Sequence, residues 1–113
     1  MKRTLQKKFL PLFILLALGI TIKAQSKYDA PADIQQLLMK NACSGCHKST
    51  EKLVGPSYLD ISKKKYSNEK IVELVHTPKP SNWPGYPAMA ALPTASKVEV
   101  TKIAVWINGL KKK

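Results

Sequence analysis

The stretch from Cys43 to His47, with the order Cys-Ser-Gly-Cys-His, places the strongest constraint on this chain. Two cysteines about one turn apart lie on the same side of the backbone. Their sulfurs can therefore bond to two vinyl groups on one edge of a porphyrin. His47 then follows under the ring, where its imidazole can bind iron. The order C-x-x-C-H predicts covalent attachment of a c-type haem at Cys43 and Cys46.

Three other uses of the two cysteines stay open at this point. A redox dithiol has the same C-x-x-C spacing, but it is expected after a strand in a βαβ unit, and the segment before Cys43 has a helical pattern. A closed zinc site takes four ligands, and the one further histidine, His76, is far from finger spacing. A disulfide between Cys43 and Cys46 would close a very small loop.

A secretory signal is predicted over residues 1–24. Basic residues precede an apolar run from 9 to 22, and Ala24 comes before a polar stretch that begins at Gln25. The apolar run contains Pro11 and is short for a bilayer span, which takes about 20 residues. We therefore expect export to the periplasm, cleavage after Ala24 and one domain over residues 25–113. An uncleaved segment that anchors the protein to a membrane is the alternative.

The chain is strongly basic, with 19 Lys and Arg against 7 Asp and Glu and a formal net charge of +12. Without residues 1–24, 14 basic and 7 acidic residues leave a net charge of +7. Such a surface attracts acidic faces of protein partners in salt-sensitive encounters. The lysine run at 63–65 is most simply a solvated face. Because it lacks interleaved aromatic residues, no nucleic-acid partner is predicted.

Four helices are predicted, over about 29–42, 58–64, 68–77 and 97–108. Ser57, Ser67 and Ser96 are the expected N-caps of the last three, and Ser96 with Glu99 forms a capping box. The first helix should bring Cys43 to its carboxyl end and pack against the last helix. Its Met39 is expected to have a packing role.

The segment 77–94 differs from the rest, because it contains five prolines and no helix or central strand is expected there. It is predicted to form a rigid strap against something flat and apolar. Met89 lies in its middle, 42 residues after His47. That separation lets the chain pass round a porphyrin and offer a thioether from the far side, and His–Met ligation raises the reduction potential. Gap-filling in the core is the alternative for Met89.

Several other residues are candidates for the same site. An iron-bound imidazole donates its second N–H to an acceptor, and a backbone carbonyl in the turn at Gly55–Pro56 is the candidate for His47. An ordinary loop turn without this role is the equal alternative. Trp83 and Tyr86 either wall the haem pocket or pack in the core. Ligation by His76 in place of Met89 is a further possibility.

Taken in order, these features resemble small bacterial class I mono-haem cytochromes c. The resemblance is carried by residues 43–47, residues 53–58, the strap around Met89 and Val105-Trp106-Ile107, and it spans 29–110. It implies a compact all-α fold of about four helices wrapped around one covalently attached haem, with crossed first and last helices.

The same resemblance implies His47 and Met89 as axial ligands and a Pro56 carbonyl that supports His47. Tyr58 belongs to the stretch that carries it, and it is placed in the haem pocket with Pro56, Trp83 and Tyr86. One departure is that the family's ligand methionine commonly has a proline directly beside it, whereas Ala88 and Ala90 flank Met89.

The function expected from this resemblance is that of an exported one-electron carrier with one haem c, monomeric and without enzyme activity. Two alternatives are a haem subunit of a larger redox enzyme, and a haem enzyme or gas sensor whose sixth ligand is labile.

Overall fold

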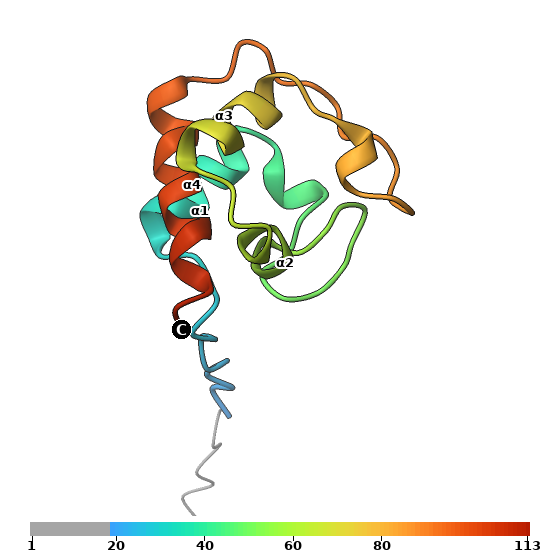
Figure 1. Ribbon diagram of the computed structural model, residues 1–113. Coiled ribbons are helices and arrows are strands. Elements are labelled where there is room, and N and C mark those ends of the chain that lie inside the picture. The colour runs from blue at the N-terminus through green and yellow to red at the C-terminus, as the bar shows by residue number, and fades with distance from the viewer. Residues whose placement is uncertain (1–18) are drawn as a thin grey trace, which may run out of the picture.

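The computed structural model describes residues 19–113, and every regular element in that range is helical (Figure 1). In chain order these are α1 (Ala32–Lys40), the 3₁₀ turn η1 (Cys43–Gly45), α2 (Tyr58–Lys63), α3 (Asn68–His76), the 3₁₀ turn η2 (Pro80–Asn82) and α4 (Lys97–Leu110). For the described residues, the predicted all-α class with about four helices is therefore confirmed.

α1 is shorter at both ends than predicted. Pro31 takes the N-cap position without a side-chain hydrogen bond, and Asn41 is the C-cap. The next residue, Ala42, has a φ of 56° in the left-handed region. A left-handed residue ends a helix, so the chain turns from α1 directly into η1. Cys43 consequently lies in this separate turn, two residues beyond the C-cap.

The three predicted serine caps are confirmed. The hydroxyl oxygens of Ser57 and Ser67 each accept a hydrogen bond at 3.0 Å, from the backbone N–H three residues further on. Ser96 accepts from the backbone N–H of Glu99 at 3.4 Å. The predicted capping box is only half formed, since the Glu99 carboxylate pairs with Lys40 of α1 instead of turning back to Ser96.

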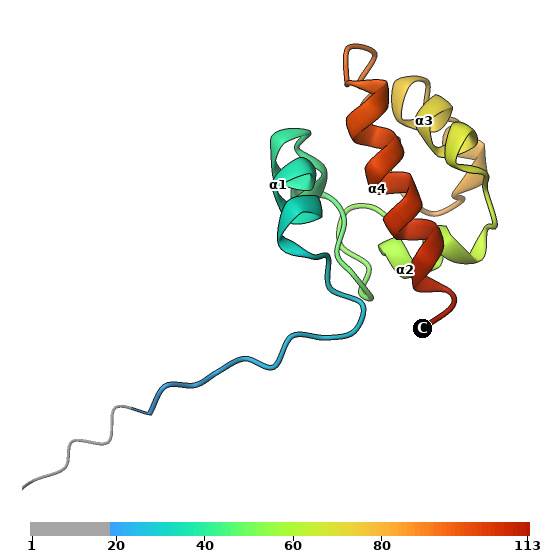
Figure 2. The same cartoon turned by 90° about the vertical axis from the view of Figure 1, so that its left-hand side faces the viewer.

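α4 is the central element, and α1, α2 and α3 all pack against it (Figure 2). Its buried residues Ile103, Ala104 and Ile107 form one cluster with Ile34 and Leu38 of α1. The first and last helices run across each other at this contact (Figure 1). Because α4 is rich in β-branched residues with poor helix propensity, this burial is what stabilises it.

The proline-rich segment 77–94 lies on the side of the molecule opposite α1 and α4 (Figure 1). The turn η2 is its one regular element, so the predicted lack of a longer helix or strand is confirmed. Backbone N–H of Leu92 donates to the Val75 carbonyl at 3.0 Å, and a ring nitrogen of His76 lies 2.8 Å from the Ala95 carbonyl oxygen. These contacts fix the end of the strap to α3.

The predicted signal segment, residues 1–24, lies mostly outside the described residues. Residues 19–24 have no regular structure, and this tail leads away from the helical body (Figure 2). Among residues 19–113, no helix combines the length and the apolar character needed to cross a bilayer.

Candidate functional site

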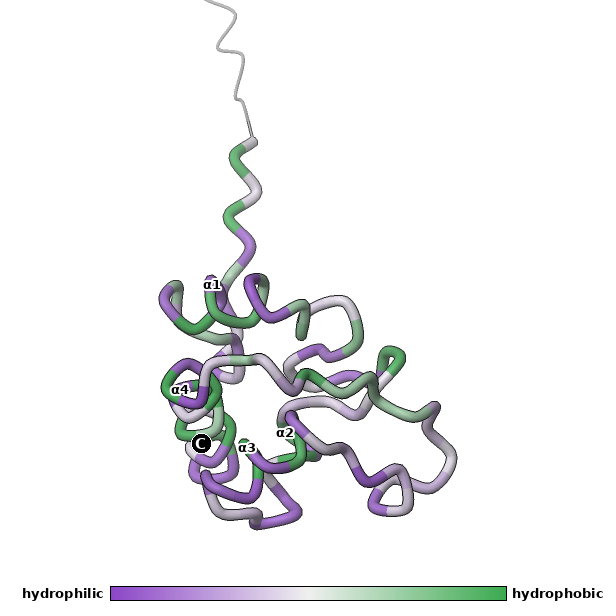
Figure 3. The backbone as a smooth tube through the Cα atoms, turned by 90° about the horizontal axis from the view of Figure 1, so that it is seen from above, coloured by the Kyte–Doolittle hydropathy of each residue, from purple (hydrophilic) through white to green (hydrophobic). Residues whose placement is uncertain are grey.

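A cavity of about 320 Å³ lies between the helices and the strap. Seen from above, the backbone surrounds this region as a ring (Figure 3). Cys43, Cys46 and His47 line it, and so do side chains of α3, α4 and the strap. The lining is largely apolar and includes Ile71, Leu74, Val75, Pro87, Ala88, Ile103 and Ile107. Cavities of this kind, with a few polar groups at defined points, are typical of cofactor sites.

The C-x-x-C-H motif is held in one tight turn at the cavity wall. The backbone N–H groups of Cys46 and His47 both donate to the Cys43 carbonyl, each at 3.1 Å. Both cysteines are free thiols; Cys43 is half-buried and Cys46 is exposed. The turn therefore presents two sulfurs and one imidazole to the same cavity.

The imidazole of His47 has a fixed orientation. Its Nδ1 lies 2.7 Å from the carbonyl oxygen of Pro56, which is the hydrogen bond expected from the sequence. A carbonyl oxygen can only accept, so Nδ1 carries the proton and donates. Nε2 is then the unprotonated nitrogen of the neutral ring, and its lone pair is available to a metal ion.

Gly55 forms a cradle for this imidazole. A Cβ atom at this position would lie 2.6 Å from His47 Cε1 and 2.9 Å from Nδ1. The backbone N–H of Gly55 also donates to the Cys46 carbonyl at 2.7 Å. The loop that follows the motif thus folds back so closely on His47 that only glycine fits.

Met89 lies in the strap and lines the same cavity as His47. Its side chain is 40% exposed, and it is not part of the buried core cluster. His76 takes a different position. One of its ring nitrogens is engaged by the Ala95 carbonyl, and it is not among the residues that line the cavity. The structure therefore brings Met89, and not His76, to the cavity that holds His47.

Trp83 and Tyr86 line the cavity and lie outside the core cluster. Their rings meet edge to face with centroids 5.8 Å apart. Lys64 Nζ lies 4.5 Å from the Trp83 ring centroid, and Lys52 Nζ lies 4.3 Å from that of Tyr86. Each contact of this kind contributes about 0.5–1 kcal/mol at an exposed site. Two positive charges thus lie beside the two aromatic residues of this wall.

Tyr58 is the most deeply buried polar residue of the cavity wall, with 5% of its surface exposed. Its ring centroid lies 5.5 Å from that of His47 and 5.0 Å from that of Trp106. Among the described residues its hydroxyl has no hydrogen-bond partner, which costs about 1–3 kcal/mol. Burial raises the pKa of this hydroxyl well above its usual value, so it keeps its proton and can donate.

Burial also changes the pKa of a thiol in the C-x-x-C-H motif. It raises the pKa of the Cys43 thiol, although a hydrogen bond from the backbone N–H of Cys43 to its own sulfur opposes the shift. A redox dithiol works through a thiolate whose pKa is lowered, and Cys43 has the opposite environment. Within residues 19–113, no three His, Cys, Asp or Glu side chains come together as a metal-ligating group.

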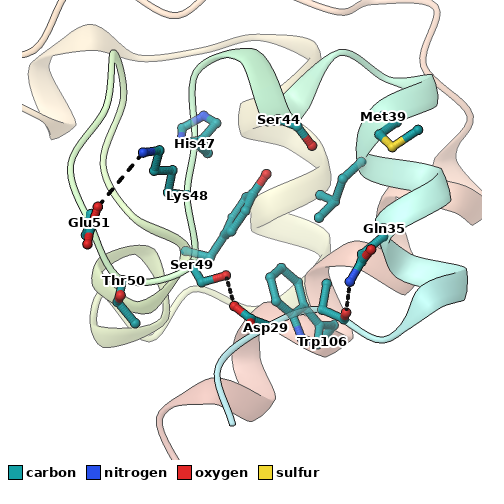
Figure 4. A pocket seen from close by; sticks show the side chains of 13 residues that line it. Asp29, Gln35, Met39, Ser44, His47, Lys48, Ser49, Thr50, Glu51 and Trp106 are labelled. Carbon is teal, nitrogen blue, oxygen red and sulfur yellow. Dashed lines mark hydrogen bonds and ion pairs between the residues drawn. The ribbon is translucent and has the colours of Figure 1, made fainter. Parts of the chain in front are cut away.

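A second, shallower hollow of about 510 Å³ lies on the outer side of the motif (Figure 4). His47, Tyr58 and Trp106 border it together with polar side chains. Some of those polar groups are paired: Ser49 donates to Asp29 at 3.1 Å, and Lys48 lies 3.9 Å from Glu51 (Figure 4). Neither cysteine and no residue of the strap borders this hollow, so the cavity that brings Cys43, Cys46, His47 and Met89 together is the better candidate site.

The structure adds site residues that the sequence analysis did not single out. Leu74 and Val75, on the predicted third helix, line the cavity, as does Tyr66. Their signal in the sequence was helical periodicity, which indicates a buried face but not what covers it. The unpartnered hydroxyl of Tyr58 had no signal in the sequence.

No protein-family model matches the chain, and no curated protein is significantly similar to it. The cavity and the residues around it are therefore the basis for assigning a function.

Proposed function

We propose that this protein is an exported, mono-haem c-type cytochrome that carries single electrons between redox partners. One observation carries the proposal. Cys43, Cys46, His47 and Met89 all border a single apolar cavity, although 42 residues separate the histidine from the methionine. A haem of this kind requires two cysteines for covalent attachment and two iron ligands, here a histidine and a methionine.

Two details of the cavity fit this cofactor. The Gly55 cradle leaves room for His47 to present Nε2 while Pro56 holds Nδ1, and a hydrogen-bonded second nitrogen is the usual support of a metal-bound imidazole. In addition, the buried hydroxyl of Tyr58 has no partner within the described chain. A buried donor of this kind is explained by an acceptor that becomes available only when a group is bound in the cavity.

In this proposal Cys43 and Cys46 hold the haem through thioethers, and His47 and Met89 are its axial ligands. The bound group supplies reversible one-electron chemistry. The apolar side chains of α3 and α4 exclude water from the iron. The Trp83 and Tyr86 wall, with Lys52 and Lys64 beside it, suits the negatively charged propionates. Because both axial positions are filled, the protein would not be an enzyme.

The partners fitting this role are redox proteins with acidic docking faces. The net positive charge of the chain favours weak, fast encounters that high salt suppresses. Transient redox complexes are small, under about 1,200 Å², so the protein is expected to purify as a monomer. Co-purification with a larger enzyme would instead favour the role of a haem subunit. We propose a periplasmic location, reached through the signal at residues 1–24.

One observation favours a second candidate. Met89 is 40% exposed, so an outside ligand has a route to the position that this side chain would occupy. A labile sixth ligand would make the protein a haem enzyme or a gas sensor. The two candidates differ in their response to carbon monoxide, which a stable Met89 ligand keeps from the reduced iron.

The experiment is export of the full chain in cells that have the haem-attachment machinery. We expect coloured protein whose haem stays on the polypeptide in a denaturing gel, and a low-spin spectrum in both oxidation states. A Cys43→Ala, Cys46→Ala double variant should lose the attached haem. Ser44→Ala, which changes a residue between the cysteines, should keep it. Colourless wild-type protein would refute the proposal, and coloured protein that binds carbon monoxide readily would favour the second candidate.

A further inference from the structure

The Tyr58 hydroxyl is buried without a partner at the wall formed by the motif. Its ring lies between His47 and Trp106, with centroids 5.5 Å and 5.0 Å away. Tyr58 lines the cavity together with Cys43 and Cys46. Cys43 also packs against the hydrophobic cluster to which Tyr58 belongs.

The hydrogen bonding of Cys43 must change when a thioether forms. As a thiol, Cys43 Sγ donates to the carbonyl oxygen of Asn41 at 3.7 Å. Addition of the thiol across a vinyl group forms one S–C bond and moves the thiol proton to the other vinyl carbon, so no oxidant or reductant is needed. The sulfur then has no proton to donate to Asn41. It keeps only its lone pairs, which accept.

We propose that Tyr58 is a positioning residue of the haem site, whose hydroxyl donates a hydrogen bond to the thioether sulfur of Cys43. This inference rests on the proposed function. It gives the buried Tyr58 hydroxyl an acceptor, and it replaces the contact that the sulfur loses. Ser57 fixes the position of Tyr58, because it caps α2 immediately before it.

Two consequences follow from such a bond. A donor to the sulfur draws electron density away from the ring, which stabilises the reduced haem and raises the reduction potential. The bond also holds the Cys43 side of the porphyrin against the wall that carries His47. Tyr58→Phe removes the donor and leaves the ring contacts with His47 and Trp106 in place.

The test uses the mature haem protein and needs two measurements. In the wild type, a vibrational band of the thioether C–S bonds should shift when H₂O is replaced by D₂O. In Tyr58→Phe this isotope shift should vanish and the reduction potential should fall. Tyr28→Phe is the matched control, since Tyr28 packs against the core but is not a residue of the cavity lining. It should retain both wild-type values.

The outcomes separate this inference from the proposed function. Colourless protein in every variant would overturn the proposed function and this inference with it. Coloured wild type without the isotope shift would overturn only this inference, because the hydroxyl would then be paired elsewhere, for example with a buried water. The wild-type measurement decides this even where Tyr58→Phe fails to fold. A potential that falls equally in Tyr28→Phe would likewise overturn it.

Discussion

Nδ1 of His47 lies 2.7 Å from the carbonyl oxygen of Pro56, and this contact connects the motif turn to the start of α2. Pro56 directly precedes Ser57, the N-cap of α2. The position of the imidazole is therefore fixed by a helix that packs on α4, and not by the loop alone. In the proposed function, a ligand held in this way would move little between oxidation states, which suits electron transfer.

Gly55→Ala should disturb the position of the His47 ring. The new Cβ would lie 2.6 Å from His47 Cε1, so either the ring or the loop must move. We expect a loss of about 1–3 kcal/mol in the free energy of unfolding, as for other overpacked sites. The spectrum of the haem protein should change as well.

Gly109→Ala is the control for this change, because nothing lies within 4 Å of a Cβ at that position in α4. Alanine there should stabilise the helix by up to about 1 kcal/mol. Denaturant unfolding monitored by circular dichroism compares the two variants. Equal behaviour of both would contradict the assigned role of Gly55.

Ile107→Ala tests the packing of a residue that belongs to the hydrophobic core and also lines the cavity. Ile107 is 4% exposed, belongs to the core cluster and lines the cavity. Its truncation should cost about 2–5 kcal/mol, as for buried isoleucines elsewhere. Val105→Ala, 55% exposed on the same helix, should change stability by at most about 0.5 kcal/mol. Chemical denaturation of the haem protein measures both, and similar losses in the two variants would rule out this packing.

The features that the sequence predicted well are those decided by residues close to one another along the chain. Ser57 and Ser67 cap their helices because a hydroxyl three positions before a backbone N–H accepts its hydrogen bond wherever the helix lies. The contact between the Pro56 carbonyl and His47 agrees with what the family resemblance implied, and it joins residues only 9 positions apart.

What the sequence did not predict depends on distant parts of the chain. Ala42 adopts a left-handed φ of 56° although alanine favours helix, so the earlier end of α1 had no local signal. The Glu99 carboxylate accepts a hydrogen bond from Lys40, which is 59 residues away, and does not complete the predicted capping box with Ser96. Leu74 faces the cavity, not solid core, and only the position of the strap decides that.

Glu99→Gln should remove a pH-dependent ion pair between Lys40 of α1 and Glu99 of α4. The hydrogen bond from Lys40 lowers the pKa of the Glu99 carboxyl below its usual 4.5. The stabilisation is thus fully present above pH 4.5 and lost as the pH falls through the lower folded-state value. The wild type should be more stable than the variant at neutral pH, by a small margin that high salt reduces.

As the pH falls below 4.5 towards the lower folded-state pKa, this margin should shrink, because the wild-type carboxylate takes up a proton as well. Urea unfolding across the acid range measures it. Glu51→Gln, which affects a looser pair with Lys48 at 3.9 Å, should change stability less at every pH. A margin that is constant from neutral to acid pH would show that the Lys40 contact does not contribute through charge.

Met89→Ala tests the ligand on the strap side of the cavity. Without the sulfur of Met89, the reduced iron should bind carbon monoxide at least about tenfold more tightly than in the wild type, a difference of about 1.4 kcal/mol. The reduction potential should fall, because a methionine ligand raises it. Met39 on α1 is 69% exposed, so its predicted packing role is wrong, and Met39→Ala should leave both values unchanged. If Met89→Ala matches the wild type in both, Met89 is a packing residue and the sixth position is open in the native protein.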